Sequence, residues 1–142
     1  QGKIIIAQSY VTAPEDRMFA LGSYLLTKGI HSFLNLEMDA PPEWWPEYGI
    51  AIGTPLQPTP DNIGALAQGS LYRRNFSNGF VLVNPAEGGA AVTVPLGGTY
   101  NRVDPVGGGA VPEDGTAPGS LIYTAVSEVT LAPKTAVVLL NR

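Results

Sequence analysis

Aromatic and acidic side chains gather in a proline-rich stretch of the first half of the chain, where Trp44, Trp45 and Tyr48 are flanked by Glu43 and Glu47. Aromatic rings stack on the apolar C–H faces of sugars, and carboxylates accept hydrogen bonds from sugar hydroxyls. The pattern is therefore typical of a carbohydrate subsite. The alternative is that one ring fills an internal interface. Because neighbours in an extended segment point to opposite sides, we expect one tryptophan to be buried and the other exposed.

Other kinds of chemical site find little support. Cysteine is absent, so neither disulfides nor thiolate metal sites are available. His31 is the single histidine, and no Gly-x-Ser-x-Gly elbow accompanies it, which argues against a Ser-His-Asp hydrolase and favours a structural or surface position. Residues 107–109 are glycines but lack the Lys-Ser/Thr of a phosphate loop. Asp104, Glu113 and Asp114 do not have the spacing of a calcium loop. We therefore predict no metal ion and no cofactor.

The composition limits the partners. Eight basic and 12 acidic residues give a net charge of −4 and a sequence pI near 4.8, so no basic field exists that could bind nucleic acid. No apolar run approaches the roughly 20 residues that span a bilayer, so no membrane partner is predicted. The sequence starts at Gln1 and reaches Ile4 to Ile6 almost at once. We expect a piece of a longer polypeptide, with a processed N-terminus as the alternative.

The first third of the sequence predicts a β-α-β unit. Residues 3–7 hold three isoleucines, the pattern of a parallel strand covered on both faces. Thr12 is predicted to cap a helix that has Pro14 in its first turn and ends before Gly29. Residues 32–38 form a second predicted strand, and the two strands with their crossover helix make a right-handed unit. The proline-rich residues 40–60 are predicted to be an ordered extended loop, with residues 50–52 as a minor strand.

The second half reads as β-structure throughout. Asn78-Gly79 predicts a two-residue type I′ hairpin turn between an exposed strand and a wholly apolar one. Arg73 and Arg74 point to opposite faces of the first strand, and we expect them to pair with acids or lie on the sheet surface. Residues 106–118 are predicted to be a mobile loop. The predicted strands are residues 71–76, 79–84, 91–95, 99–103, 120–125, 128–131 and 135–140.

Together these elements predict a mainly β fold. A C-terminal antiparallel, Greek-key-like β-sandwich follows the β-α-β segment. We expect two domains, residues 1–66 with the β-α-β unit and the Pro/Trp-rich loop, and residues 67–142 with the β-sandwich.

Several segments in this order resemble the end of a (β/α)8-barrel glycoside hydrolase and its C-terminal β-domain. The barrel-like segments are residues 3–8, 15–26, 31–36 and 44–48, and residues 129–140 resemble the last hairpin of such β-domains. The most specific segment is Arg-Asn-Phe-Ser-Asn-Gly-Phe-Val-Leu-Val-Asn-Pro, residues 74–85, which is similar to the start of the β-domain. The resemblance implies a carbohydrate-active parent with a poly- or oligosaccharide substrate, and a secreted or extracellular location.

Active sites of barrels lie at the carboxyl ends of their strands. By this resemblance, the ends in this chain carry Gln8 and the pair Glu37 and Asp39. The two acids are two residues apart on one strand, so they project side by side and do not flank a sugar as acid and nucleophile must. Gln8 is an amide and does not ionise. We therefore predict no catalytic residue in this chain, and assign Gln8, Glu37, Asp39, Glu43, Trp44, Trp45 and Tyr48 to substrate contact.

Three roles follow for the chain. The first is the C-terminal portion of a glycoside hydrolase, inactive alone because earlier strands would supply the acid and base. The second is a non-catalytic carbohydrate-binding module that recognises a polysaccharide through exposed aromatics. The third is a structural domain that covers the flank of a barrel; isolated, its β-α-β face would self-associate through apolar surface.

Overall fold

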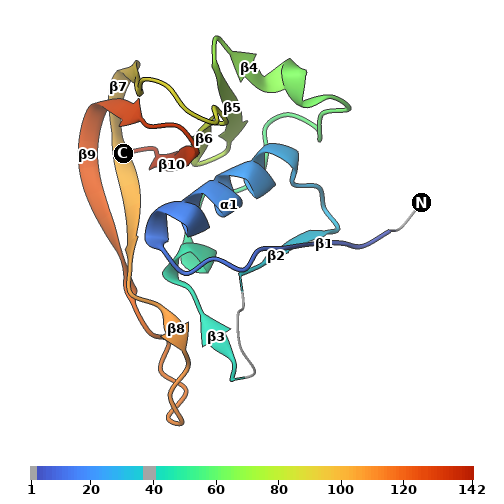
Figure 1. Cartoon of the computed structure of the whole chain (residues 1–142), viewed down its shortest axis with the longest axis vertical. Helices are drawn as coiled ribbons and strands as arrows, with labels where there is room; N and C mark the ends of the chain where they lie inside the picture. The colour runs from blue at the N-terminus through green and yellow to red at the C-terminus, as the bar shows by residue number, and fades with distance from the viewer. Residues whose placement is uncertain (1–2, 37–40) are drawn as a thin grey trace.

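The computed structural model of the chain describes residues 3–36 and 41–142 (Figure 1). Among them are one α-helix, α1 (Pro14–Thr27), and the 3-10 helices η1 (Pro46–Gly49) and η2 (Ile63–Leu66). The strands are β1 (Ile5–Gln8), β2 (Ser32–Asn35), β3 (Glu43–Trp44), β4 (Ala67–Gln68), β5 (Leu71–Phe76), β6 (Gly79–Asn84), β7 (Val92–Val106), β8 (Gly109–Ala110), β9 (Ser120–Leu131) and β10 (Thr135–Leu140). The predicted fold class, mainly β with an opening β-α-β segment and an antiparallel C-terminal part, is confirmed.

The opening unit is parallel. β1 and β2 form a two-stranded sheet in which Ile5 lies beside Ser32 and Gln8 beside Asn35. The helix that connects them packs its apolar face on the larger sheet, against β5, β6 and β10. In Figure 1, α1 lies at the centre, between the β1–β2 pair and the larger sheet. The helix therefore belongs to both halves of the chain. It does not have the length and apolar character to span a membrane, and no other helix of the described residues does.

The predicted helix cap is wrong. The N-cap residue is Ala13, whose side chain makes no cap hydrogen bond, and Pro14 occupies the first turn. The Thr12 carbonyl accepts a hydrogen bond from the Arg17 side chain instead. Thr12, the expected cap, thus serves as a backbone acceptor for an arginine of the helix and does not cap it with its side chain.

The opposite end of α1 is capped by Arg74, which corrects its predicted position. The side chain is 1% exposed. Its Nη1 donates to the carbonyls of Leu25 at 2.9 Å, Leu26 at 3.2 Å and Lys28 at 2.9 Å. Its Nη2 donates to the Gln57 carbonyl at 3.3 Å. A cation at the carboxyl end of a helix is favoured by the helix dipole and satisfies carbonyls that have no partner within the helix.

The large sheet has six strands in the order β4-β5-β6-β10-β7-β9, and every neighbouring pair is antiparallel. β10 is central, and every residue of β6 is buried. One apolar cluster lies between α1 and the sheet and includes Met18, Leu21, Leu25, Val81, Val83, Val138 and Leu140. A second cluster lies on the other face and consists of Leu71, Phe80, Leu82, Val129, Leu131, Val137 and Leu139.

The second cluster exists because β7 and β9 bend. Residues 101–103 of β7 pair with β10, whereas residues 92–95 pair with the end of β9. The register between them shifts from Pro95 to Tyr100. The strands predicted as separate segments, residues 91–95 and 99–103, are therefore one strand that folds over the sheet, and so are residues 120–125 and 128–131. The bent sheet thus encloses the second cluster by itself, while its other face packs against α1 to enclose the first.

The hairpin turn falls one residue earlier than predicted. Phe76 pairs with Gly79, so the two turn residues are Ser77 and Asn78. Gly79 begins β6 with φ of +146°, and a Cβ there would overlap the Leu139 carbonyl oxygen. Glycine is needed because β10, the neighbouring strand in the sheet, approaches too closely for a side chain.

The loop between β2 and β5 is held by the C-terminal half of the chain. β3 pairs antiparallel with β8, and the Val111 N–H donates to the Pro42 carbonyl at 2.8 Å. Residues 106–111, predicted as part of a mobile loop, thus form a contact with the Trp-rich segment. Residues 50–52, predicted as a minor strand, are not a strand.

Candidate functional site

The carboxyl ends of β1 and β2 lie side by side, as parallel pairing requires. Gln8 is the last residue of β1, is exposed, and lies opposite Asn35, the last residue of β2. The Ser9 N–H continues the pairing with a 3.0 Å bond to the Asn35 carbonyl. Glu37 and Asp39, the two acids expected at this edge, lie outside the described residues.

Trp44 and Tyr48 form an aromatic pair next to this edge, which we call the aromatic platform. Their ring centroids are 5.7 Å apart with an interplanar angle of 74°. The Leu36 N–H donates to the Tyr48 hydroxyl at 2.7 Å, which ties the platform to the residue that follows β2 by one position. Trp44 is 37% exposed, so its ring is accessible to a ligand.

The second tryptophan points inward. Trp45 is 5% exposed, and the Arg17 guanidinium lies 4.3 Å from the centre of its ring. The expectation of one buried and one exposed tryptophan is confirmed. An exposed ring suits stacking on a sugar, whereas a buried one contributes packing.

Glu47 is also buried, which changes its expected role as a surface acceptor for sugar hydroxyls. Its Oε1 accepts from Arg17 Nε in an ion pair whose side chains are 2% and 0% exposed. Arg17 Nη2 donates to the Gly107 carbonyl at 3.0 Å. The pair therefore joins α1, η1 and the turn after β7, with Trp45 packed beside it.

Sequence patterning does not single out Arg17. The available signal is its spacing: Arg17, Leu21 and Leu25 are four residues apart and continue one buried stripe of the helix. A charge on an apolar stripe requires a buried partner, since a lone charge is costly to bury. That partner lies 30 residues away and is not visible from local sequence.

Glu43 lies in β3, opposite Ala110 of β8, and is half-buried. The structure therefore brings Trp44 and Tyr48 together near the ends of β1 and β2. Glu43, which precedes Trp44 in β3, is half-buried. Trp45 and Glu47 are buried in the interior.

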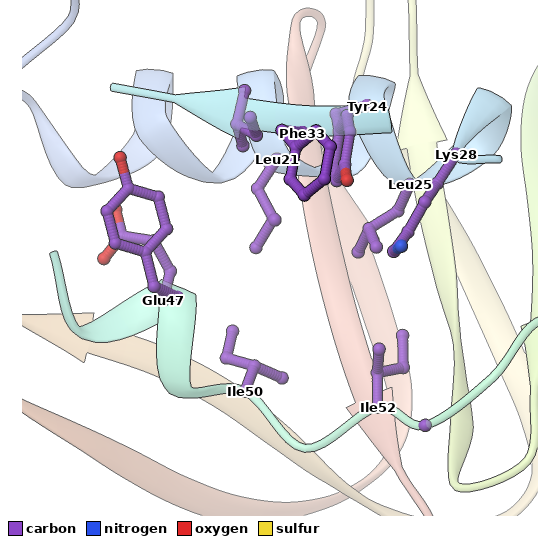
Figure 2. A pocket seen from close by; sticks show the side chains of 11 residues that line it. Leu21, Tyr24, Leu25, Lys28, Phe33, Glu47, Ile50 and Ile52 are labelled. Atoms are coloured by element: carbon purple, nitrogen blue, oxygen red, sulfur yellow. The ribbon is translucent and has the colours of Figure 1, made fainter. Parts of the chain in front are cut away.

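A pocket of about 310 Å³ lies between α1, β2 and the segment after η1 (Figure 2). Figure 2 shows Leu21 and Leu25 of the helix opposite Ile50 and Ile52, with Phe33 and Tyr24 above. The Tyr24 hydroxyl donates to the Ser32 carbonyl at 2.6 Å, and burial raises the pKa of Tyr24 above its ordinary 10.0. Tyr48 of the aromatic platform and Glu47 line the same pocket.

Metal chemistry gains no support from the part of the chain that the structure describes, where no group of three or more His, Cys, Asp or Glu side chains could hold an ion. His31 is exposed, and its carbonyl accepts from Ile5 N–H at 2.9 Å.

The described residues thus form a parallel β-α-β unit followed by an antiparallel sheet, with the aromatic platform close to the carboxyl ends of the parallel strands. Residues 3–80 match the hypothetical glycosyl hydrolase family 15. The match covers more than half of the 142 residues, so the chain belongs to this family. No curated protein and no solved structure matches the chain. The matched segment includes β1, α1, β2, the aromatic platform and β5.

Proposed function

We propose that the chain is the C-terminal portion of a glycoside hydrolase, with residues 1–66 ending a (β/α)8 barrel and residues 67–142 forming an accessory β-domain. The observation that carries this proposal is the β1–β2 pair. A two-stranded parallel sheet is not a self-sufficient structure, because parallel strands are normally covered on both faces.

The surface of that pair supports the same proposal. Ile4, Ile6 and Phe33 are 69%, 66% and 55% exposed. Ile6 and Phe33 are partners in the parallel register, so they lie next to each other. An apolar patch of this kind marks a surface that another part of a protein covers. Further barrel strands beside β1 and β2 would cover it.

Carbohydrate contact would fall to the aromatic platform and the strand ends. Trp44 offers an accessible ring, Tyr48 sets its position, and Gln8 lies exposed at the same end of the parallel pair. Glu37 and Asp39 complete the proposed contact set. The catalytic acid and base would come from other strands, so the chain by itself would bind a sugar without cleaving it.

A second candidate is a carbohydrate-binding module that holds polysaccharide without belonging to a catalytic barrel. The aromatic platform, in which Trp44 is exposed and Tyr48 half-buried, favours it as strongly as it favours a barrel subsite. The upstream coding sequence separates the two: six further βα units indicate a barrel, and an unrelated domain indicates a module.

Binding is tested by retention of the purified chain on insoluble polysaccharides, with release of reducing sugar measured alongside. We expect retention that is lost in Trp44→Ala. Tyr123→Ala is the matched control, because Tyr123 is 53% exposed on β9 and does not belong to the platform. Retention unaffected by Trp44→Ala would refute the platform's role. Hydrolysis that disappears in Glu37→Gln would show that the chain is catalytically complete.

A further inference from the structure

We infer that the β-domain positions the aromatic platform, through a clamp made by Arg17 and the glycine turn after β7. The clamp consists of Arg17, Trp45, Glu47, Gly107 and Gly108. Only the identification of the platform's ligand as carbohydrate rests on the proposed function; the clamp itself is a geometric arrangement with its own test.

The polar part of the clamp joins three segments that are distant in sequence. Arg17 of α1 donates to the Glu47 carboxylate and to the Gly107 carbonyl, the latter at 3.0 Å. These acceptors come from the Trp-rich loop and from the β-domain. One guanidinium group therefore fixes the loop and the β-domain relative to the helix, which suits the planar, forked arrangement of its donors.

The apolar part is a close approach of backbone to ring. A Cβ on Gly108 would lie 2.5 Å from Trp45 Cε3 and 3.1 Å from the Trp44 carbonyl oxygen. A Cβ on Gly119 would lie 2.6 Å from Pro46 Cγ. Glycines at both places thus let the β-domain press against Trp45 and Pro46, while Trp44 pairs with Gly109 through the β3–β8 ladder.

The clamp holds the residues between the two platform rings. Trp45 and Glu47 lie inside it, and Trp44 and Tyr48 are their immediate neighbours in sequence. With the inner residues fixed, the outer rings have little freedom to move apart. A ligand that stacks on them then meets a preorganised surface, which raises affinity because less side-chain freedom is lost on binding.

The decisive variant is Gly108→Ala, and Gly89→Ala is its matched control. The two glycines have φ of +101° and +106°, so both substitutions carry a similar backbone strain. Only at Gly108 does the new methyl group meet a neighbour, since nothing lies within 4 Å of a Cβ at Gly89. A difference between the variants therefore reports the close approach of the glycine turn to Trp45 and to the adjoining Trp44 carbonyl and Pro46 ring.

The readout is acrylamide quenching of tryptophan fluorescence, together with the near-ultraviolet circular dichroism of the same samples. In the unchanged chain the exposed Trp44 should be quenched and the buried Trp45 protected. Gly108→Ala should make Trp45 quenchable and weaken the tryptophan bands of the dichroism spectrum. Gly89→Ala should leave both signals unchanged.

A second variant guards against loss of folding. The double substitution Arg17→Met with Glu47→Met removes both members of the buried pair, so that neither charge is left without a partner. The double variant should unfold near the temperature of the unchanged chain, yet show the quenching pattern of Gly108→Ala. Polysaccharide affinity should fall roughly tenfold in both, a change equivalent to about 1.4 kcal/mol.

Wild-type quenching in both Gly108→Ala and the folded double variant would overturn the clamp. Loss of Trp45 protection in a chain that binds no polysaccharide would support the clamp and refute the proposed carbohydrate contact at the platform. The two failures are therefore distinguishable.

Discussion

Replacing Arg74 with methionine should destabilise the chain more than any conservative change on the same strand. Methionine retains much of the apolar stem but removes the guanidinium that caps α1. The carbonyls of Leu25 and Lys28 each lose a 2.9 Å hydrogen bond, and those of Leu26 and Gln57 lose longer ones.

The magnitude follows from these contacts. A hydrogen bond from a charged donor contributes about 1.5–3 kcal/mol, and the two short bonds alone give about 3–6 kcal/mol. Part of this is offset, because burial of the guanidinium is itself unfavourable and Arg74 Nε has no partner among the described residues. Burial lowers the pKa of Arg74, in keeping with that penalty. We expect a net loss of about 3 kcal/mol of unfolding free energy.

The assay is urea unfolding followed by far-ultraviolet circular dichroism, with thermal unfolding as a second measurement. A loss of 3 kcal/mol corresponds to a fall in Tm of roughly 10 °C for a chain of this size. Arg73→Met is the control on the adjacent residue. The Arg73 guanidinium lies 3.7 Å from the Phe80 ring centre and bonds one side chain, so about 1 kcal/mol is expected. Equal losses for the two arginines, or a larger loss at Arg73, would refute the assigned cap.

Three further outcomes follow from the structure. Gly79→Ala should cost more than about 3 kcal/mol because the methyl group meets a backbone carbonyl of β10, whereas Gly69→Ala, with φ of +63° and open space around it, should cost about 1 kcal/mol. Burial raises the pKa of Tyr24 above its ordinary 10.0, so the folded state holds the hydroxyl proton more tightly than the unfolded state does. The stability that this proton contributes should therefore be lost as pH rises above 10. Denaturation measured against pH should show the loss, and Tyr24→Phe should remove it. Self-association of the isolated chain, measured by sedimentation, should weaken in Ile6→Lys and persist in Leu56→Lys, since both side chains are exposed but only Ile6 belongs to the β1–β2 patch.

Much of the fold could be predicted because local sequence patterns determine many of its strands and its helix. The bounds of β5, β6 and β10 agree with the prediction to the residue, since each is a short run of strand-forming side chains between turn residues. The apolar stripe formed by Met18, Leu21 and Leu25 at helical spacing likewise predicted α1 and its buried face.

Features that depend on distant neighbours were missed. Gly97-Gly98 indicates a turn locally, but β9 follows the same bend, so β7 continues through it. The two-residue strands β3 and β8 exist only because the segment after β7 approaches the Trp-rich loop. No local signal forecasts either.

The candidate site divides in the same way. The alternation of an extended segment sufficed to predict that one tryptophan would be exposed and the other buried. The burial of Glu47, Arg17 and Arg74 was not predictable from type alone, because charged side chains are rarely buried without partners. Apart from the Thr12 carbonyl, five residues from Arg17, these partners are 17 to 90 residues distant.

The place of β10 in the sheet has a consequence for biosynthesis. Residues 135–140 are made after the other strands of this sheet, yet they lie between β6 and β7 and supply Val138 and Leu140 to the surface on which α1 rests. While these residues are being synthesised, α1, which was made more than 100 residues earlier, has no completed sheet to pack against. The apolar face of α1 therefore stays exposed until β10 has been synthesised. Chaperone binding during translation should be greatest in that interval.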